Sequence, residues 1–214
     1  MVHTHSDSIR RQLLDSELEV VKPLIRGKVL EVGAGHRPRR GSFQPPVGEC
    51  SGWWYLDIHD SRQPDVRATV LNLPFQDSIF DTVICLEVLK YVSDLRGAVE
   101  ELVRVVSLGR RVLLSAPLMH PVDAPNDYWQ FTLHALKRLV EEAGLSVDRV
   151  CHQGHRLGSV LGLFSQLARD WQPSSTRSVI TRLFTFLTRF DRETTGRTYT
   201  TGYLIIATNR KHVS

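Results

Sequence analysis

Apolar residues follow two different rhythms along this chain. Short, continuous apolar runs occur at residues 28–32, 53–58, 66–71, 80–86, 111–115, 145–150 and 199–208. Such runs are typical of strands buried on both faces of a parallel sheet. Residues 8–25, 94–106 and 132–143 instead place apolar side chains every three or four positions, which predicts amphipathic helices. Strands that alternate with helices predict an α/β domain with a seven-stranded, mostly parallel sheet.

Turn and cap residues predict where two of the helices end. Pro23 and Gly27 should end the first helix, which we expect to lie over the sheet ahead of the first strand. Thr132 is expected to cap the helix that starts there, and Gly144 is expected to stop it.

The segment at residues 155–197 departs from the alternation and predicts a helical insertion before the last strand. It holds two apolar helical patterns, at residues 157–171 and 179–190, and we interpret it as a lid or a partner surface. The second pattern combines phenylalanines with arginines, and a basic amphipathic helix can lie on an anionic membrane. More often such a stripe packs on its own protein or on a second subunit, so we expect that packing, with a homodimer as one form of it.

Length, composition and charge bound the class of protein. With 214 residues, 42% hydrophobic and 23% charged, the chain is expected to form one domain over residues 1–214, with residues 1–27 as an N-terminal helix. The net charge of +4 comes from basic residues that are spread along the chain, so we expect no nucleic-acid partner.

Cysteine usage and the N-terminus bear on the compartment. Cys50, Cys85 and Cys151 are odd in number and far apart, which argues against a disulfide framework or a zinc site. His3 and His5 lack further ligands, so we expect no metal. The N-terminus has no apolar core of a signal peptide and no apolar run reaches membrane-spanning length, so a cytoplasmic location is expected.

A glycine turn and an acidic strand end carry the candidate chemistry. Gly33 and Gly35 follow the first strand, and Asp57 closes the strand at residues 53–58. In two large cofactor classes this carboxylate accepts hydrogen bonds from ribose hydroxyls while the glycine loop borders the other end of the cofactor. A dinucleotide needs a third glycine that opens a helix, and residues 36–39 contain none. Glu31 before the turn also disfavours a pyrophosphate and favours a cationic sulfonium or amino group, hence S-adenosylmethionine (SAM) over NAD(P).

Several segments in order resemble the class I SAM-dependent methyltransferases, in particular the methyltransferase-11-like group. They read VLEVGAG, YLDI, LPFQDSIFDTVICLEVLKYV and ELVRVVSLGRRVLLSAP. HPVDAPNDYWQFTLHALKRLVEEAGL is similar to a subgroup with a P-x-D-Y-W-x-F-T segment after strand five, which is often associated with glycan or other secondary biosynthesis. The resemblance implies a Rossmann-like fold, SAM as the cofactor and methyl transfer.

The resemblance also implies roles for particular residues. Gly33 and Gly35 would border the methionine and ribose part of the cofactor, with Glu31 near its amino group. Asp57 would take the ribose hydroxyls. The remaining contacts would be Ile58 on one face of the adenine, residues 70–73 with Leu71 and Asn72 at its edge, and Leu86 and Glu87 under the sulfonium. Glu87 has an alternative reading as a solvated cap of the next helix.

The sequence also departs from the family pattern. Thr69 stands where an acid commonly faces the adenine amino group, and Lys90-Tyr91 stands where Glu-His is common. The loop after Gly35 looks short of helix, and we hypothesise that Arg37 or Arg39 pairs with the cofactor carboxylate.

Polar residues after strand five raise the question of a catalytic base. His120 is a candidate to take a proton from a substrate hydroxyl, oriented by Asp123 or Asp127. Asp127, Tyr128 and Trp129 are more simply interpreted as a loop held by turns and a packed ring. Methyl transfer from a sulfonium also proceeds by positioning and desolvation alone, so the absence of any base is an equal alternative.

The sequence therefore predicts transfer of a methyl group from SAM to a small-molecule or glycan acceptor. The methylated atom is expected to be oxygen, and S-adenosylhomocysteine (SAH) is released. Two alternatives from other classes are a SAM-binding module without catalysis and an NAD(P)-dependent oxidoreductase. Turnover of any acceptor excludes the first, and the missing third glycine argues against the second.

Overall fold

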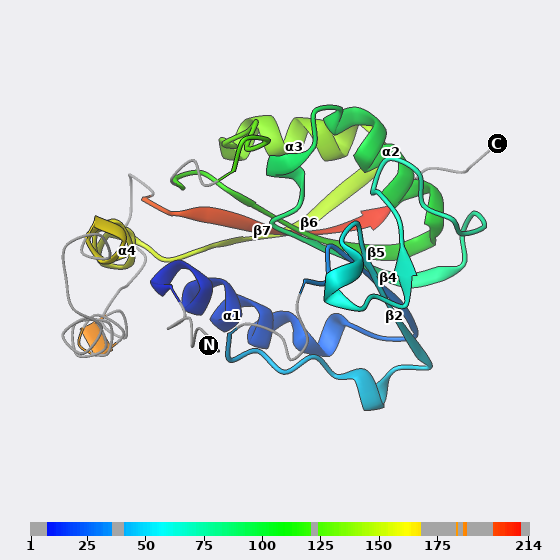
Figure 1. Cartoon of the computed structure of the whole chain (residues 1–214), viewed down its shortest axis with the longest axis horizontal. Helices are drawn as coiled ribbons and strands as arrows, with labels where there is room; N and C mark the ends of the chain where they lie inside the picture. The colour runs from blue at the N-terminus through cyan, green and yellow to red at the C-terminus, as the bar shows by residue number, and fades with distance from the viewer. Residues whose placement is uncertain are drawn as a thin grey trace.

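In the computed structural model, seven strands form one open sheet in the order β3-β2-β1-β4-β5-β7-β6 (Figure 1). The structure describes residues 8–35, 41–120, 124–167 (backbone only for 165–167), 183, 186, 187 and 199–210. The strands are β1 Lys28–Val32, β2 Gly52–Asp57, β3 Val66–Arg67, β4 Phe80–Leu86, β5 Val106–Pro117, β6 Leu145–His152 and β7 Gly202–Asn209. The pairings among β1 to β5 are parallel, and β7 runs antiparallel to both of its neighbours. The predicted α/β fold with a mostly parallel sheet is confirmed.

Helices cover both faces of the sheet. They are α1 Ile9–Val21, α2 Leu95–Val105, α3 Leu133–Glu142 and α4 Arg156–Leu167, with short 3-10 turns η1 Lys22–Leu24, η2 Val47–Glu49, η3 Asp60–Arg62 and η4 Leu89–Tyr91. Figure 1 shows α2 and α3 on one face and α1 on the other, so the molecule has three layers. The helix α4 packs beside α1.

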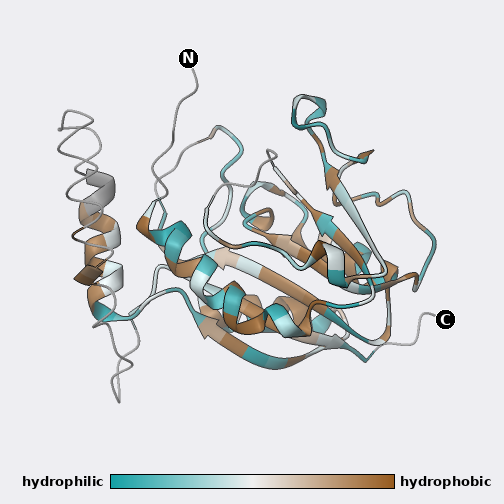
Figure 2. Ribbon diagram, turned by 90° about the horizontal axis from the view of Figure 1, so that it is seen from below, coloured by the Kyte–Doolittle hydropathy of each residue, from teal (hydrophilic) through white to brown (hydrophobic). Residues whose placement is uncertain are grey.

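The alternation of side chains along the strands builds two apolar layers. On the α1 face, Val29 and Leu113 pack with Leu14 and Leu18, and the strands behind α1 are mostly brown in Figure 2. On the opposite face a larger cluster joins the sheet to α2 and α3, for example through Leu102. Both layers exclude water, and together they hold the strand ends in fixed positions.

The helix ends follow the predicted chemistry. The Thr132 hydroxyl accepts a hydrogen bond from the Ala135 amide at 3.3 Å and caps α3, and Gly144, with φ of +103°, follows the C-cap. The first helix ends earlier than the prediction of residues 8–25. Its α-helical part stops at Val21, and Pro23 lies in η1, because proline lacks the N–H that would continue the α-helical ladder.

Strands β3 and β5 differ most in length from the prediction, whereas β6 ends two residues later and β7 starts three residues later than expected. Strand β3 was expected at residues 66–71 but ends at Arg67, because the Thr69 hydroxyl and carbonyl accept from Leu71 and Asn72 and form a turn. Strand β5 starts at Val106 rather than at residue 111, since its pairing with β4 begins there and is interrupted by a register shift. Such irregularities depend on hydrogen bonds between distant segments, which local patterning does not contain.

The insertion at residues 155–197 is described only in part. Its first predicted helix corresponds to α4. Of the second pattern, residues 183, 186 and 187 are helical, and the rest lies outside the described residues.

Within the described ranges, no helix is both long enough and apolar enough to cross a bilayer. The same residues contain no cluster of histidine, cysteine and acidic side chains suited to a metal ion. Cys50, Cys85 and Cys151 are free thiols.

A pair of leucines on β5 tests how much the α1-face layer stabilises the fold. Leu113 is fully buried and Leu108 is 45% exposed on the same strand. Leu113→Ala should lower the free energy of unfolding by about 2–5 kcal/mol, because it removes buried methyl groups and leaves a cavity. The control Leu108→Ala should change it by less than about 0.5 kcal/mol. Urea unfolding followed by circular dichroism measures both, and equal losses would contradict the described packing.

Candidate active site

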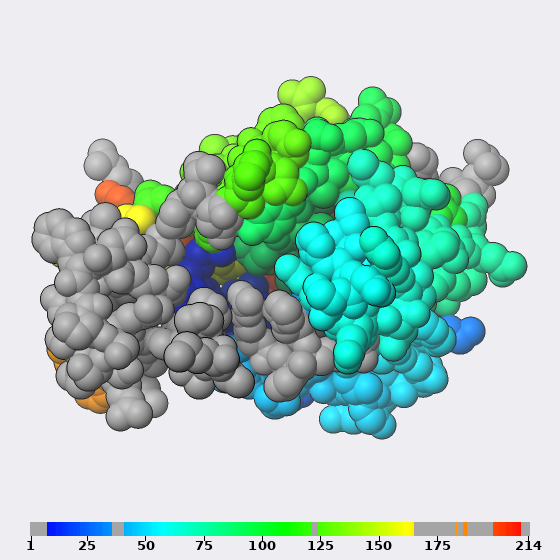
Figure 3. Space-filling view, viewed as in Figure 1, coloured from blue at the N-terminus to red at the C-terminus, as the bar shows by residue number. Residues whose placement is uncertain are grey.

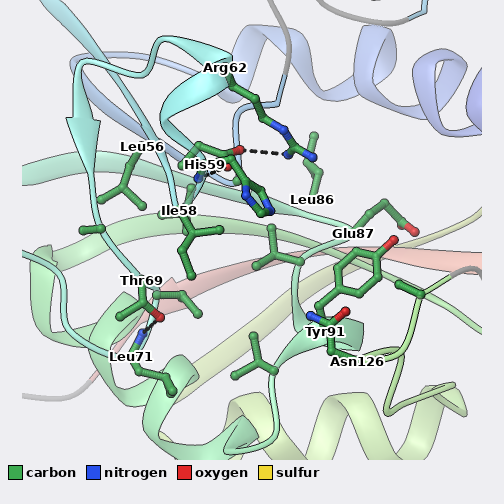
Figure 4. Close-up of a pocket in the computed structure, with 18 of the residues that line it drawn as sticks. Leu56, Ile58, His59, Arg62, Thr69, Leu71, Leu86, Glu87, Tyr91 and Asn126 are labelled. Carbon is green, nitrogen blue, oxygen red and sulfur yellow. Dashed lines mark hydrogen bonds and ion pairs between the residues drawn. The ribbon is translucent and has the colours of Figure 1, made fainter.

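A cavity of about 510 Å³ opens at the carboxyl ends of β1, β2 and β4 (Figure 4). Its walls come from the ends of β1 and β2 with the following turn, from residues 68–71, and from parts of residues 86–93 and 124–128. The chain order reverses between β1 and β4, and open α/β sheets bind ligands at this kind of switch point. Figure 3 shows the surface hollowed on this side of the molecule, with the blue start of α1 at the back of the hollow.

The turn after β1 requires a glycine. Gly33 has φ of +70°, and its amide donates to the carbonyl of Leu56 at 2.8 Å. A Cβ on Gly33 would lie 2.2 Å from a methyl carbon of Val88. Gly33 therefore lets the backbone of β1 and the residues after β4 close one wall of the cavity.

Asp57, at the end of β2, is a buried carboxylate with three donors. One oxygen, Oδ2, accepts from the amide of Gly35 at 2.9 Å and from Nη1 of Arg62 at 3.1 Å. The other, Oδ1, accepts from the amide of His59 at 2.9 Å. Burial raises the pKa of Asp57, but the two backbone N–H groups and the Arg62 guanidinium outweigh it and hold the pKa below its ordinary value of 3.8. Asp57 is thus an ionised acceptor on the cavity wall.

Apolar side chains line the cavity next to Asp57. Ile58 and Leu71 both line it, and Ile58 is 57% exposed. Thr69 lines it as well, with its hydroxyl accepting from the amide of Leu71 at 3.3 Å. Figure 4 shows Thr69 and Leu71 on the opposite side of the cavity from Glu87 and Tyr91.

Glu87 lines the cavity where β4 ends, in an unusual conformation. Its φ is +62°, which costs free energy for a residue with a Cβ. The amide of Glu87 donates to the carbonyl and hydroxyl oxygens of Ser115, and its carboxylate accepts from the Ser115 hydroxyl at 2.7 Å. The other carboxylate oxygen forms an ion pair with Arg10 of α1. Of the two alternatives for Glu87, a solvated helix cap does not fit, because Asp94 caps α2.

Sequence reasoning missed Arg10, although the sequence carries a signal for it. Arg10 stands four residues before Leu14 and eight before Leu18, on the stripe that faces the sheet, and it is only 9% exposed. A buried cation on an apolar stripe needs an anionic partner, which predicts an ion pair for Arg10. The local sequence does not indicate that the partner is Glu87.

A second buried cation lies behind the cavity wall. Lys90 is 2% exposed, and its Nζ lies 3.3 Å from Nδ1 of His120 and 3.4 Å from Oδ2 of Asp127. It also lies 4.3 Å from the centre of the Tyr91 ring. The structure thus brings His120 close to Asp127, with 3.9 Å between Nδ1 of His120 and Oδ2 of Asp127. It also places Lys90 beside both residues, a contact that the sequence did not predict.

The same contacts hold the loop after β5 against the residues after β4. The amide of Tyr128 donates to the carbonyl of Lys90 at 2.8 Å, and Nε1 of Trp129 donates to the carbonyl of Val92 at 2.7 Å. The loop is therefore held by hydrogen bonds, as the simpler interpretation expected, but Trp129 is 40% exposed rather than packed. Tyr128 and Asn126 reach the cavity from this loop.

Some predicted residues do not line the cavity. Glu31 lies on the α1 face of β1, 4% exposed, and accepts from Nε1 of Trp53 at 3.2 Å. Gly35 contributes through its amide to Asp57, and Asn72 closes the turn after β3. His120 stands behind the wall, and Arg37, Arg39 and Asp123 lie outside the described residues. The cofactor role of each predicted residue, and the base role of His120, stay predictions.

Part of the chain matches a known family model and a known protein. Residues 56–114 match the family model described as methyltransferase domain. Over 99 residues the chain is 31% identical to an uncharacterized methyltransferase, YcgJ, of Bacillus subtilis, which covers 41% of this chain. The match spans only 39% of that relative's length, about two fifths.

Solved structures share the architecture over nearly the whole chain. The crystal structure of YcgJ from Bacillus subtilis superposes with a TM-score of 0.59 at 16% identity and covers 94% of this chain and 99% of that one. A methyltransferase structure from Bacillus halodurans gives 0.60 at 15%, covering 92% and 99%. A SAM-dependent methyltransferase from Archaeoglobus fulgidus gives 0.56 at 15%, covering 93% and 94%. The fold is that of the class I methyltransferases. The predicted resemblance to methyltransferases is therefore confirmed for the fold and for residues 56–114, and the subgroup with the P-x-D-Y-W-x-F-T segment stays a prediction.

The cavity suits SAM, the cofactor that the resemblance to methyltransferases implies. SAM carries a ribose and a sulfonium, and the cavity presents an ionised carboxylate at Asp57 and a second acid at Glu87. The turn at Gly33 leaves no room for a Cβ, so its backbone lies close to the part of the cavity between Asp57 and Glu87. These observations agree with SAM as the cofactor.

The lowered pKa of Asp57 predicts a contribution to stability that depends on pH. Because the folded pKa lies below the ordinary value of 3.8, the contribution is present above 3.8 and is lost as the pH falls from there through the folded pKa. The unaltered protein should therefore lose more stability than Asp57→Asn when the pH is lowered from 6 to about 3. Thermal unfolding at a series of pH values measures this, and parallel curves for the two proteins would contradict the assignment.

Proposed function

We propose that this chain transfers a methyl group from SAM to an oxygen of a small-molecule or glycan acceptor and releases SAH. The observation that carries the proposal is the cavity at the switch point, where the ionised Asp57 and the glycine turn after β1 meet. The methyltransferase-domain match at residues 56–114 covers Asp57 and the residues after β4.

The residues divide the cavity into a nucleoside side and a transfer side. Asp57 would accept the ribose hydroxyls, and Ile58 and Leu71 would cover the adenine with apolar surface. Glu87 would lie beside the sulfonium, held by Ser115 and Arg10. When bound, SAM supplies an activated methyl group that needs no metal and no covalent enzyme intermediate.

The acceptor would enter on the side of Tyr91, Asn126 and Tyr128. Figure 4 shows Tyr91 and Asn126 next to Glu87 at this end of the cavity. Tyr91 is 36% exposed and Tyr128 is 56% exposed, so their rings offer flat apolar surface with polar edges. Aromatic rings and an amide suit a sugar or another small ring with hydroxyl groups. This supports a hydroxyl-bearing acceptor.

Closure of the cavity and alignment of the acceptor would supply much of the rate enhancement. In-line positioning of a hydroxyl against the methyl group replaces a bimolecular encounter with a local one. His120 would take the hydroxyl proton after a small movement of the loop that carries Asn126 and Tyr128, with Lys90 and Asp127 orienting its ring.

Binding of SAH tests the cofactor assignment. Asp57→Asn should weaken SAH binding by about tenfold or more, because a charged acceptor for the ribose hydroxyls is replaced by a neutral one. Calorimetry measures the dissociation constants, with Asp148→Asn as the control, since Asp148 is a β6 carboxylate that accepts from Thr208. If the unaltered protein binds NADH and not SAH, the methyltransferase proposal fails.

Replacement of His120 tests the base. With an acceptor found by screening small phenols and sugars against methyl-labelled SAM, His120→Ala should lower turnover about 10²–10⁴-fold. The dissociation constant of SAH should not change. His134→Ala, on the exposed face of α3, is the control. Full turnover by His120→Ala would show that positioning without a base is sufficient.

A further inference from the structure

The Arg62 side chain forms an ion pair with Asp57, the carboxylate that the proposed function assigns to the ribose hydroxyls. It lies in η3, directly after β2, and lines the cavity together with Asp57. Its Nη1 donates to Oδ2 of Asp57 at 3.1 Å, the ion pair that the dashed line from Arg62 marks in Figure 4.

While this ion pair is formed, Asp57 has few free acceptor positions for the hydroxyls of a sugar. A carboxylate has about four lone-pair positions. Oδ2 already accepts from the Gly35 amide and from Arg62, and Oδ1 accepts from the His59 amide. About one position then remains, on Oδ1, whereas the two neighbouring hydroxyls of a ribose need two.

Of the three donors, Arg62 is the one that can leave. The Gly35 and His59 donors are backbone amides fixed by the turns after β1 and β2. The Arg62 side chain is 34% exposed, and Asp57 is 2% exposed. A long side chain at the cavity rim can move into solvent without any change in the backbone, which neither amide can do.

Asp57 keeps two other donors when Arg62 leaves. The amides of His59 and Gly35 each lower its pKa independently of the guanidinium. Departure of Arg62 would therefore leave a carboxylate that is still held by two backbone N–H groups and has a second free position for the sugar.

We propose that Arg62 is an internal competitor of the ribose, which must leave Asp57 before the nucleoside can bind with both sugar hydroxyls. The inference rests on the proposed function, because it assumes a nucleoside cofactor. Since SAM and SAH carry the same ribose, Arg62 lowers the affinity for both and favours release of the product after transfer. Its effect is small, because a partly exposed ion pair is weak.

Adenosine is the decisive probe, because it carries the ribose and no charge of its own. Arg62→Gln should bind adenosine and SAH about two- to fivefold more tightly than the unaltered protein. Arg62→Gln removes the positive charge and leaves only a neutral amide donor on a shorter side chain, whereas Arg62→Lys keeps a charged donor for Oδ2 and should stay near the unaltered value. The control is Arg96→Gln, which breaks an exposed ion pair with Glu100 on α2, away from the cavity, and should change neither affinity. Unchanged or weaker binding by Arg62→Gln would overturn the inference.

A double-mutant cycle separates competition at Asp57 from any other role of Arg62. In an Asp57→Asn background the gain from Arg62→Gln should largely disappear, because the carboxylate for which the two donors compete is absent. A gain of the same size in that background would overturn the inference.

The unaltered protein provides a test that does not depend on a variant folding. Salt screens the ion pair more than it affects a neutral ligand, so adenosine should bind more tightly as salt is raised. A constant or falling affinity would count against competition. If the unaltered protein binds neither SAH nor adenosine, the proposed function fails and this inference fails with it. Binding without a gain in Arg62→Gln defeats the inference alone.

Discussion

Two backbone amides help to keep a buried carboxylate charged at the end of a parallel strand, and the site is built around that arrangement. The donors are Gly35, in the turn after β1, and His59, in the turn after β2, so both strands must end side by side for Asp57 to be held. The apolar layers on both faces of the sheet maintain that alignment. The charge of Asp57 is therefore a consequence of strand packing rather than of neighbouring cations alone.

The other charged groups of the site follow the same principle of pairing at strand ends. Glu87 leaves β4 with a positive φ and is held by Ser115 of β5 and by Arg10 of α1. Lys90 is buried behind the cavity wall beside Asp127 and His120. Each buried charge thus joins two or three segments, which positions the wall of the cavity as well as its chemistry.

The sequence predicted the order of strands and helices and the turn chemistry, because these depend on local periodicity and on residues such as Thr132 and Gly144. It also marked seven of the residues that line the cavity, namely Gly33, Asp57, Ile58, Val70, Leu71, Leu86 and Glu87. It misplaced the end of β3 and the start of β5, where turn hydrogen bonds and sheet register decide. Arg10 and Arg62 were not predicted, since their anionic partners are 77 and 5 residues away and the orientation of a long side chain is not encoded locally.

By itself the sequence determined the fold class, the glycine turn and the acid at the end of β2, because each follows from residue types at fixed local spacing. Only the tertiary structure decided which donors surround that acid, where Glu31 points, and that His120 meets Lys90 and Asp127. The physical reason is that the contacts Gly35–Asp57, Glu31–Trp53 and Lys90–Asp127 join segments 22 to 37 residues apart, and their geometry depends on how the sheet aligns the strand ends.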